Sequence, residues 1–149
     1  MSSAAPHPVT KIPVVGSRPV VRVVHPCGRL RGHEAALTRG IAALEESGCE
    51  VRWDPSGADA SWRGYLAGDD QRRLHEFCAA LIEDDVDVIW FARGGSGANR
   101  IASGVIHAAR NLPPRAVVGF SDATGILMPL TQRLGWRSFH GPVVTSLGR

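Results

Sequence analysis

The chain has 149 residues, of which 44% are hydrophobic and 21% are charged, and its formal net charge at pH 7 is +3. These proportions are typical of one globular domain and exclude both a disordered tail and a fibrous repeat. The basic residues are almost all arginine, and only Arg72 and Arg73 are adjacent, so they form no basic stripe of the kind that binds nucleic acid. We therefore expect a soluble domain without a nucleic-acid partner.

The number and spacing of the cysteines and histidines argue against a disulfide-bonded or metal-binding domain. Cys27, Cys49 and Cys78 are odd in number and form no C-x-x-C pair, so neither a disulfide framework nor a zinc knuckle is predicted. The six histidines lack the spacing of metal ligands, and we expect no metal. No segment approaches the roughly 18 apolar residues of a membrane helix, and the first 15 residues lack a signal-peptide pattern. The sequence thus predicts a cytoplasmic protein with no membrane partner.

The N-terminal residues differ in composition from the rest of the chain. Residues 1–19 contain four prolines and several small polar residues, which predicts a flexible arm followed by one domain over residues 20–149. The β-branched run Val20–Val24 predicts the first strand. Apolar residues at helical spacing follow it until Gly48, which predicts a helix that ends there.

The strand–helix pattern then repeats three times. The predicted strands are residues 49–53, 86–92 and 116–120, and the predicted helices carry apolar residues within 74–81, 101–106 and 126–134. Asp69 or Asp70 could cap the first of these helices, and Pro129 is expected to interrupt the last. Alternating strands and helices favour right-handed crossovers, so we expect a flavodoxin-like or Rossmann-like α/β sandwich of three layers with a mostly parallel sheet. Ligands bind such folds beyond the carboxyl ends of the strands.

A nucleophile-elbow pattern lies where the fourth predicted strand meets the following helix. This turn requires small residues two positions before and after the nucleophile, and Gly119 and Ala123 flank Ser121 in this way. The turn would expose the Ser121 hydroxyl and direct the N–H of Asp122 toward a developing oxyanion. On this pattern alone, the alternative that Ser121 or Asp122 merely caps the helix stays open.

A glycine-rich loop follows the third predicted strand. The segment Arg93–Arg100 matches dinucleotide-binding loops poorly, because Arg100 stands where the pattern needs a small residue, and it lacks the lysine of a P-loop. Its N–H groups could instead bind an anion such as a carboxylate. Arg93 could add a bidentate contact to that carboxylate, or it could simply be solvated.

Two histidines lie at predicted strand ends on the functional edge of the sheet. His25 and His140 could each reach Ser121 as a base, although hydrogen-bonded loop histidines would have the same positions. Cys27 lies at the same edge without an activating neighbour and is interpreted as a packing residue.

Together these segments resemble the N-terminal domain of the LD-carboxypeptidase family, the serine peptidases of family S66, which include the microcin-C immunity peptidases. The matching segments, in family order, are Val24–Gly28, Gly64–Asp70 with Arg72 or Arg73, Ile89–Arg100, Val118–Thr124 and Phe139–Pro142. The chain departs from the family pattern at His25, Cys27 and Ser96, where members usually have Ala, Ser and Tyr. These departures concern the contacts to the substrate.

The resemblance implies a chemistry and a set of site residues. Ser121 would be the nucleophile, and the N–H of Asp122 would contribute to the oxyanion hole. The residues implied to bind substrate are Arg93, Gly94, Gly95, Ser96, Gly97 and His140. Family members hydrolyse the bond between an L-centre and a terminal D-amino acid, typically in murein tetrapeptides during cell-wall recycling, and no metal or organic cofactor is implied.

The resemblance also leads to an expectation about the catalytic Glu and His. Family members continue into a second domain that supplies the Glu and His of the triad, whereas this sequence stops at Arg149, so we expect that C-terminal domain to be absent and the chain alone to be inactive. We then expect a homo-oligomer or a complementary C-terminal domain to cover an apolar patch, with Trp136 and Pro142–Leu147 as candidates. Two alternatives stay open. One is a non-catalytic module that binds peptidoglycan peptides or a terminal carboxylate, and the other is an enzyme that uses His140 or His25 as a substitute base.

Overall fold

The computed structural model describes residues 16–148, and within this range the chain forms one five-stranded parallel sheet of order β2-β1-β3-β4-β5. The strands are β1 (Val20–Val24), β2 (Glu50–Arg52), β3 (Val88–Phe91), β4 (Ala116–Gly119) and β5 (Ser138–His140). The helices are α1 (Glu34–Glu46), α2 (Ser56–Asp59), α3 (Asp70–Ile82), α4 (Ala98–Ala109) and α5 (Thr124–Leu134), with 3-10 turns η1 (Ser121–Ala123) and η2 (Val144–Ser146). Most of the predicted arm, residues 1–15, lies outside the described residues.

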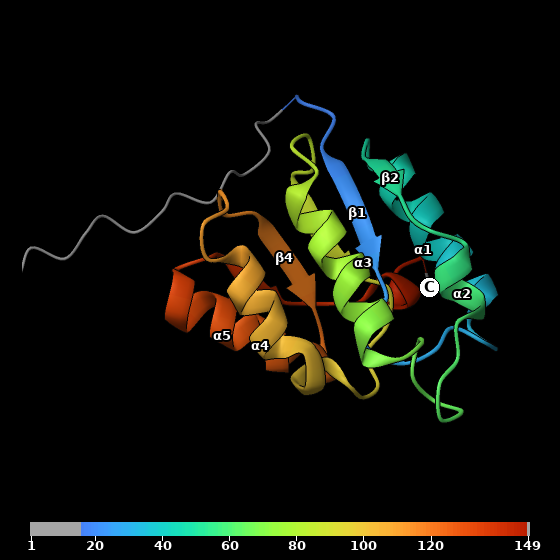
Figure 1. Ribbon diagram of the computed structural model, residues 1–149. Helices are drawn as coiled ribbons and strands as arrows, with labels where there is room; N and C mark the ends of the chain where they lie inside the picture. Colours follow the sequence, from blue (N-terminus) through green and yellow to red (C-terminus); the bar gives the residue numbers. More distant parts are fainter. Residues whose placement is uncertain (1–15, 149) are drawn as a thin grey trace, which may run out of the picture.

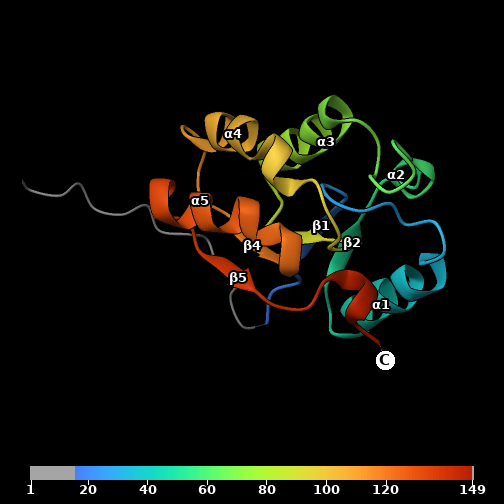
Figure 2. The same ribbon diagram turned by 90° about the horizontal axis from the view of Figure 1, so that it is seen from below.

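The helices lie on both faces of the sheet (Figure 1). Seen from below, α3, α4 and α5 form a row above the strands, while α1 and the C-terminal turn η2 lie beneath them (Figure 2). The chain moves outward from β1 to β2 and then returns past β1 to β3, so right-handed crossovers place α1 and the later helices on opposite faces. The predicted three-layer α/β fold with a parallel sheet is therefore confirmed.

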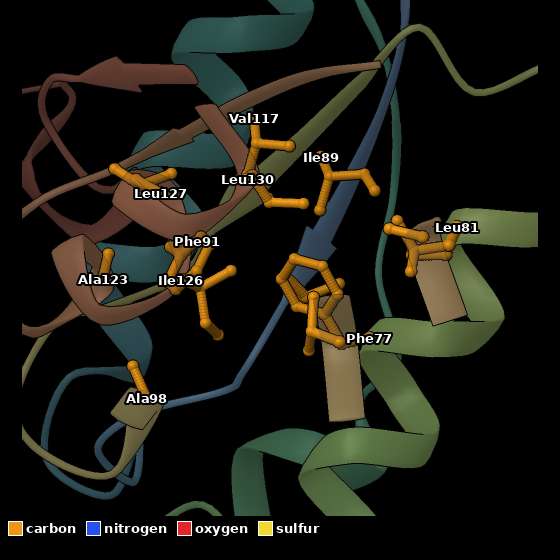
Figure 3. Close-up of a cluster of buried hydrophobic side chains, with 14 of the residues drawn as sticks. Phe77, Leu81, Ile89, Phe91, Ala98, Val117, Ala123, Ile126, Leu127 and Leu130 are labelled. Atoms are coloured by element: carbon orange, nitrogen blue, oxygen red, sulfur yellow. The ribbon is translucent and has the colours of Figure 1, made fainter. Parts of the chain in front are cut away.

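The larger hydrophobic core fills the space between the sheet and α3–α5 (Figure 3). Phe77 and Phe91 meet edge to face at its centre, with ring centroids 5.8 Å apart. A smaller core on the α1 side contains Val23 and Val144. On that side the cover decreases toward β5, where Phe139 is 47% exposed.

The element positions agree with the sequence pattern in most places. β1 has the predicted bounds, and Asp69 caps α3 by accepting a hydrogen bond from the Arg72 N–H. One expectation was wrong, because α5 continues through Pro129 instead of being interrupted by it. The short helix α2 follows β2 in a segment for which the sequence pattern predicted neither a helix nor a strand. Helix α5 thus forgoes one backbone hydrogen bond at Pro129, whose nitrogen carries no hydrogen.

Substitution of Gly40 should separate α1 from the C-terminal segment. A Cβ at Gly40 would overlap the carbonyl oxygen of Val144, which belongs to the backbone of η2 and cannot move aside freely. We expect Gly40→Ala to lower the free energy of unfolding by about 1–3 kcal/mol, although alanine is the better helix former by about 1 kcal/mol. Urea denaturation measures this change. The matched control is Gly104→Ala in α4, where the nearest atom is the mobile Cδ2 of Leu74 and a much smaller loss or a gain is expected.

Candidate active site

The turn after β4 has the geometry that a nucleophile elbow requires. Ser121 adopts a left-handed backbone conformation with φ of 60°, and its side chain is exposed. A Cβ at Gly119 would lie 2.6 Å from the Cβ of Ala123 and 3.0 Å from the ring of Phe91, so only glycine fits at this position. Left-handed backbone is costly for a residue with a side chain, and such strain is typical of functional sites.

Asp122 connects this turn to the glycine loop through its side chain. Its carboxylate accepts a hydrogen bond of 2.8 Å from the N–H of Ala98, the first residue of α4. The N-cap of α4 is Gly97, which has no side chain to perform this role. Asp122 therefore caps a helix, as one alternative proposed, but it caps α4 and not its own helix.

The Asp122 carboxylate also affects a buried thiol. Cys27 is fully buried, and desolvation together with the negative charge and hydrogen bond of Asp122 raises the pKa of its thiol. The thiol therefore stays protonated at neutral pH and can donate to the carboxylate. This contact agrees with the interpretation of Cys27 as a packing residue.

A cavity of about 340 Å³ lies beside Ser121. Its lining residues are His33, Ala36, Arg39, Arg93, Gly94, Gly95, Phe120, Ser121, Val143, Thr145 and Ser146. The structure thus brings Arg93, Gly94 and Gly95 together with the proposed nucleophile. Ser96, Gly97 and His140, which the sequence also placed at the substrate, do not line this cavity.

The glycine loop approaches the elbow closely. A Cβ at Gly94 would lie 3.3 Å from the carbonyl oxygen of Phe120 and 3.6 Å from the Cβ of Ser121. The Gly94 carbonyl accepts a 3.0 Å hydrogen bond from the N–H of Gly28 in the loop after β1. Arg93 donates from Nη1 to the carbonyl oxygen of Arg29 at 2.9 Å, so it also ties the two loops together.

His140 lies next to Ser121 without contacting its hydroxyl by a hydrogen bond. The Ser121 N–H donates to Nε2 of His140 at 3.3 Å, and the imidazole lies against the ring of Phe120 with centroids 4.8 Å apart. His140 lines two neighbouring cavities of about 450 and 360 Å³, one against α5 and one beside Pro142. In this arrangement Nε2 is engaged by the backbone and not by the group that a base would deprotonate.

Of the two roles that the sequence left open for His25, the structure shows the hydrogen-bonded histidine and not a base at Ser121. His25 is buried, its Nδ1 lies 2.7 Å from the Glu76 carboxylate on α3, and its ring packs against Gly57. The sequence placed His25 correctly at the end of β1, but the side chain points into the protein and not toward the elbow.

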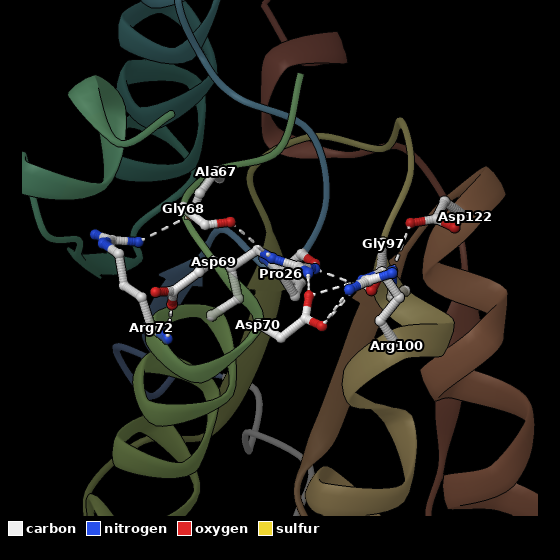
Figure 4. A network of polar contacts seen from close by, with 11 residues as sticks. Pro26, Ala67, Gly68, Asp69, Asp70, Arg72, Gly97, Arg100 and Asp122 are labelled. Atoms are coloured by element: carbon white, nitrogen blue, oxygen red, sulfur yellow. Dashed lines mark hydrogen bonds and ion pairs between the residues drawn. The ribbon is translucent and has the colours of Figure 1, made fainter. Parts of the chain in front are cut away.

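Arginine side chains hold the base of the glycine loop (Figure 4). Arg73 is fully buried and donates to the carbonyl oxygens of Pro26 at 2.6 Å and Gly97 at 2.9 Å. Arg73 also pairs with Asp70, which binds Arg100 through nitrogen–oxygen contacts of 2.7 and 2.8 Å. Hydrogen bonds and charge from Arg100 and Arg73 hold the pKa of the Asp70 carboxyl below its usual value. Arg100, which broke the dinucleotide pattern, thus has a structural role.

Sequence reasoning missed the part of the cavity that comes from α1 and the C-terminal segment. His33 and Arg39 belong to the start of α1 and its first turns, while Thr145 and Ser146 belong to η2. No local motif marks these residues. The only available signal was that α1 follows the loop after β1 at the functional edge of the sheet.

Two negative observations apply to residues 16–148. In this range no three His, Cys, Asp or Glu side chains are grouped so that they could hold a metal ion. Nor does this range contain a helix with the length and apolar character needed to cross a bilayer.

Comparison with known proteins identifies the family. The sequence model of the LD-carboxypeptidase N-terminal domain, Peptidase S66, matches residues 21–141. The chain belongs to the LD-carboxypeptidase family. A Bacillus subtilis protein named as a probable murein peptide carboxypeptidase is 33% identical over 110 residues, which are 74% of this chain and 34% of that protein.

Further relatives agree with this LD-carboxypeptidase assignment. The murein tetrapeptide carboxypeptidase of Pseudomonas aeruginosa is 36% identical over 88 residues, 56% of this chain and 27% of that protein. The structure of the microcin C7 self immunity protein MccF has a TM-score of 0.82 at 20% identity and covers 95% of this chain and 42% of its own, which supports the fold. The chain spans about a third of the length of the relatives that it matches in sequence.

Replacement of the elbow serine in this LD-carboxypeptidase domain should relieve backbone strain. Glycine adopts positive φ freely, so we expect Ser121→Gly to raise the free energy of unfolding by about 0.5–1 kcal/mol, net of the entropy that glycine adds to the unfolded chain. Chemical denaturation measures the difference. Ser103→Gly on the exposed side of α4 is the matched control and should lower stability by about 0.5 kcal/mol. Equal losses in both variants would contradict a strained elbow.

Removal of the Asp70 charge should destabilise the domain in a pH-dependent way. The pKa of Asp70 is lowered in the folded state, so its ion pairs stabilise the fold above the ordinary carboxyl pKa of about 4, and this contribution is lost as the pH falls through the folded value. We expect Asp70→Asn to lower stability at pH 7 and the difference from the parent to shrink at pH 3. Denaturation at both pH values tests this. Asp84→Asn, at an exposed site, is the matched control and should change the stability at pH 7 little.

Proposed function

We propose that residues 20–149 form the nucleophile domain of a serine-type LD-carboxypeptidase that releases a terminal D-amino acid from murein tetrapeptide-type L,D-peptides in cytoplasmic cell-wall recycling. The observation that carries this proposal is the left-handed Ser121, held at a cavity against the glycine loop. The names of the Bacillus and Pseudomonas relatives, which refer to murein peptides, support the substrate class.

The reaction begins with attack of the Ser121 hydroxyl oxygen on the scissile carbonyl carbon. The carbonyl oxygen becomes an oxyanion, which the N–H of Asp122 and an N–H of the loop around Gly94 and Gly95 stabilise. Both donors belong to backbone that is held in place by hydrogen bonds. The Asp122 carboxylate accepts one from the N–H of Ala98, and the Gly94 carbonyl accepts one from the N–H of Gly28. Preorganised donors of this kind cost no reorganisation when charge develops.

The proton of the Ser121 hydroxyl requires a base. His140 does not fill this role in our proposal, since its Nε2 accepts the Ser121 N–H and no carboxylate orients its ring within residues 16–148. We assign the base to residues outside the range 1–149, a Glu and a His of a C-terminal domain. The acyl-enzyme formed after departure of the D-amino acid is then hydrolysed by water, which the same base activates.

An apolar surface beside the site supports a covering partner, which we propose to be that C-terminal domain or a second copy of the chain. Of the candidates suggested by sequence, Trp136 is 2% exposed and Val144 is fully buried, whereas Pro142 is exposed and lines a cavity with Phe120 and His140. Two exposed aromatic residues, Phe120 and Phe139, lie on this surface and are 51% and 47% exposed. They lie at the end of β4 and in β5, next to His140, where the sheet has little cover.

We expect the purified chain to release no D-alanine from murein tetrapeptide at an enzyme-like rate, and turnover to appear when a homologous C-terminal domain is added. Loss of the base from a serine hydrolase costs on the order of 10⁴–10⁶ in kcat. D-Alanine release is measured for the chain and for Ser121→Ala, each alone and mixed, with sedimentation of the mixtures to establish association.

The outcomes of this assay separate the alternatives. Turnover by the chain alone that disappears in Ser121→Ala would show that a base lies within these residues. Binding of the tetrapeptide without turnover in an associated mixture would favour the non-catalytic module. Turnover that survives Ser121→Ala in the mixture would contradict the role of Ser121.

A further inference from the structure

The cavity beside Ser121 carries positive charge from two separate parts of the chain. Arg93 lines it from the glycine loop and Arg39 lines it from α1, while His33, the N-cap of α1, adds an imidazole. None of its lining residues is an Asp or Glu. Thr145 and Ser146 add hydroxyl and backbone groups on the same side as α1. This composition suits an anionic ligand that accepts several hydrogen bonds.

The two arginines differ in what they already bind. Arg93 is partly buried and donates from Nη1 to the Arg29 carbonyl oxygen at 2.9 Å, so some of its guanidinium N–H groups already bind within the protein. Arg39 is exposed, and within residues 16–148 its guanidinium makes no hydrogen bond or ion pair. All five of its N–H donors therefore remain available to a ligand in the cavity.

The backbone that carries Arg39 is nevertheless held in place. Gly40, the next residue, packs directly against the carbonyl of Val144, and Gly148 packs against the carbonyl of Arg39, where a Cβ would lie at 2.8 Å. The C-terminal segment is itself hydrogen-bonded to the end of β3, since the Thr145 N–H donates to the carbonyl oxygen of Ala92 at 3.0 Å. The position of α1 beside the glycine loop is thus fixed by packing, and only the Arg39 side chain is free to adjust.

We propose that Arg39 binds the C-terminal carboxylate of the peptide and thereby determines that the enzyme removes a terminal residue. This inference rests on the proposed function. In a carboxypeptidase substrate the free carboxylate lies one residue beyond the scissile carbonyl, so a carbonyl placed at Ser121 brings that carboxylate into the adjoining cavity. A planar guanidinium binds a carboxylate through two parallel hydrogen bonds, and an amide in its place would lose one acceptor and the charge.

The test compares two murein tetrapeptides that differ only at the terminal D-alanine, which carries either a free carboxylate or an amide. All other carboxylates of the peptide are the same in both. Binding is measured by NMR titration of the 149-residue chain in a Ser121→Ala background, so that no peptide is consumed. The variants are Arg39→Gln and the control Arg110→Gln, which changes an exposed arginine at the C-cap of α4 in the same way.

We expect amidation to weaken binding to the parent about tenfold, and Arg39→Gln to weaken binding of the free-acid peptide by a similar factor. The amidated peptide should bind Arg39→Gln no more weakly than it binds the parent, because the partner of Arg39 is already missing. Arg110→Gln should bind both peptides as the parent does. Thermal unfolding of each variant confirms that the fold is retained.

Three results would overturn the inference. Equal weakening of both peptides by Arg39→Gln would assign Arg39 to another carboxylate of the peptide. Equal affinity of the parent for the free-acid and the amidated peptide would contradict a carboxylate subsite without contradicting the proposed function. Failure of the parent to bind either peptide at millimolar concentration would overturn the inference and the proposed function together.

Discussion

The loops of the candidate site converge on one buried charge, the guanidinium of Arg73. Its Nη1 donates to the carbonyls of Pro26 and Gly97, its Nε donates to the carbonyl of Gly68 at 3.3 Å, and its remaining nitrogen pairs with Asp70. A buried cation without such partners would cost several kcal/mol, so the fold is stable only when the loop after β1 and the loops before α3 and α4 all reach it. Gly97 shows how tight this convergence is, because a Cβ there would lie 2.6 Å from Arg73 Nη1.

This convergence determines where Ser121, the proposed nucleophile, lies relative to the glycine loop. The far end of that loop is held by the Arg73–Gly97 hydrogen bond and by the Asp122 carboxylate on Ala98, and its near end by the Gly28–Gly94 hydrogen bond. Asp122 immediately follows Ser121, so the elbow and the loop share an anchor. Oxyanion donors act through position, and a shift of a fraction of an ångström weakens them. In the proposed reaction, the hydrogen bonds around the site therefore serve its chemistry as well as its stability.

Features that depend on local sequence could be predicted, and features that depend on distant contacts could not. Periodicity predicted β1 and most helices, and the pair Gly119 and Ala123 around Ser121 predicted a tight turn, because both signals lie within a few residues. The direction of His25 and the burial of Trp136 depend on which elements pack over them, and hydrophobicity alone does not show this. Arg39 was missed for the same reason.

The two sides of the site rest on different hydrophobic cores, and the strand order is the reason. The order β2-β1-β3 reverses the direction of chain growth between β1 and β3, which places α1 and α4 on opposite faces of the sheet. The cavity lies between the glycine loop, the elbow, α1 and η2. On one side the elbow and α4 rest on the larger core, and on the other α1 rests on the smaller one. Bond-making needs atoms held at a defined distance, whereas a charged carboxylate can be bound by a flexible arginine on a fixed helix. The unequal cores thus match the different precision that the proposed attack by Ser121 and the proposed carboxylate binding by Arg39 would require.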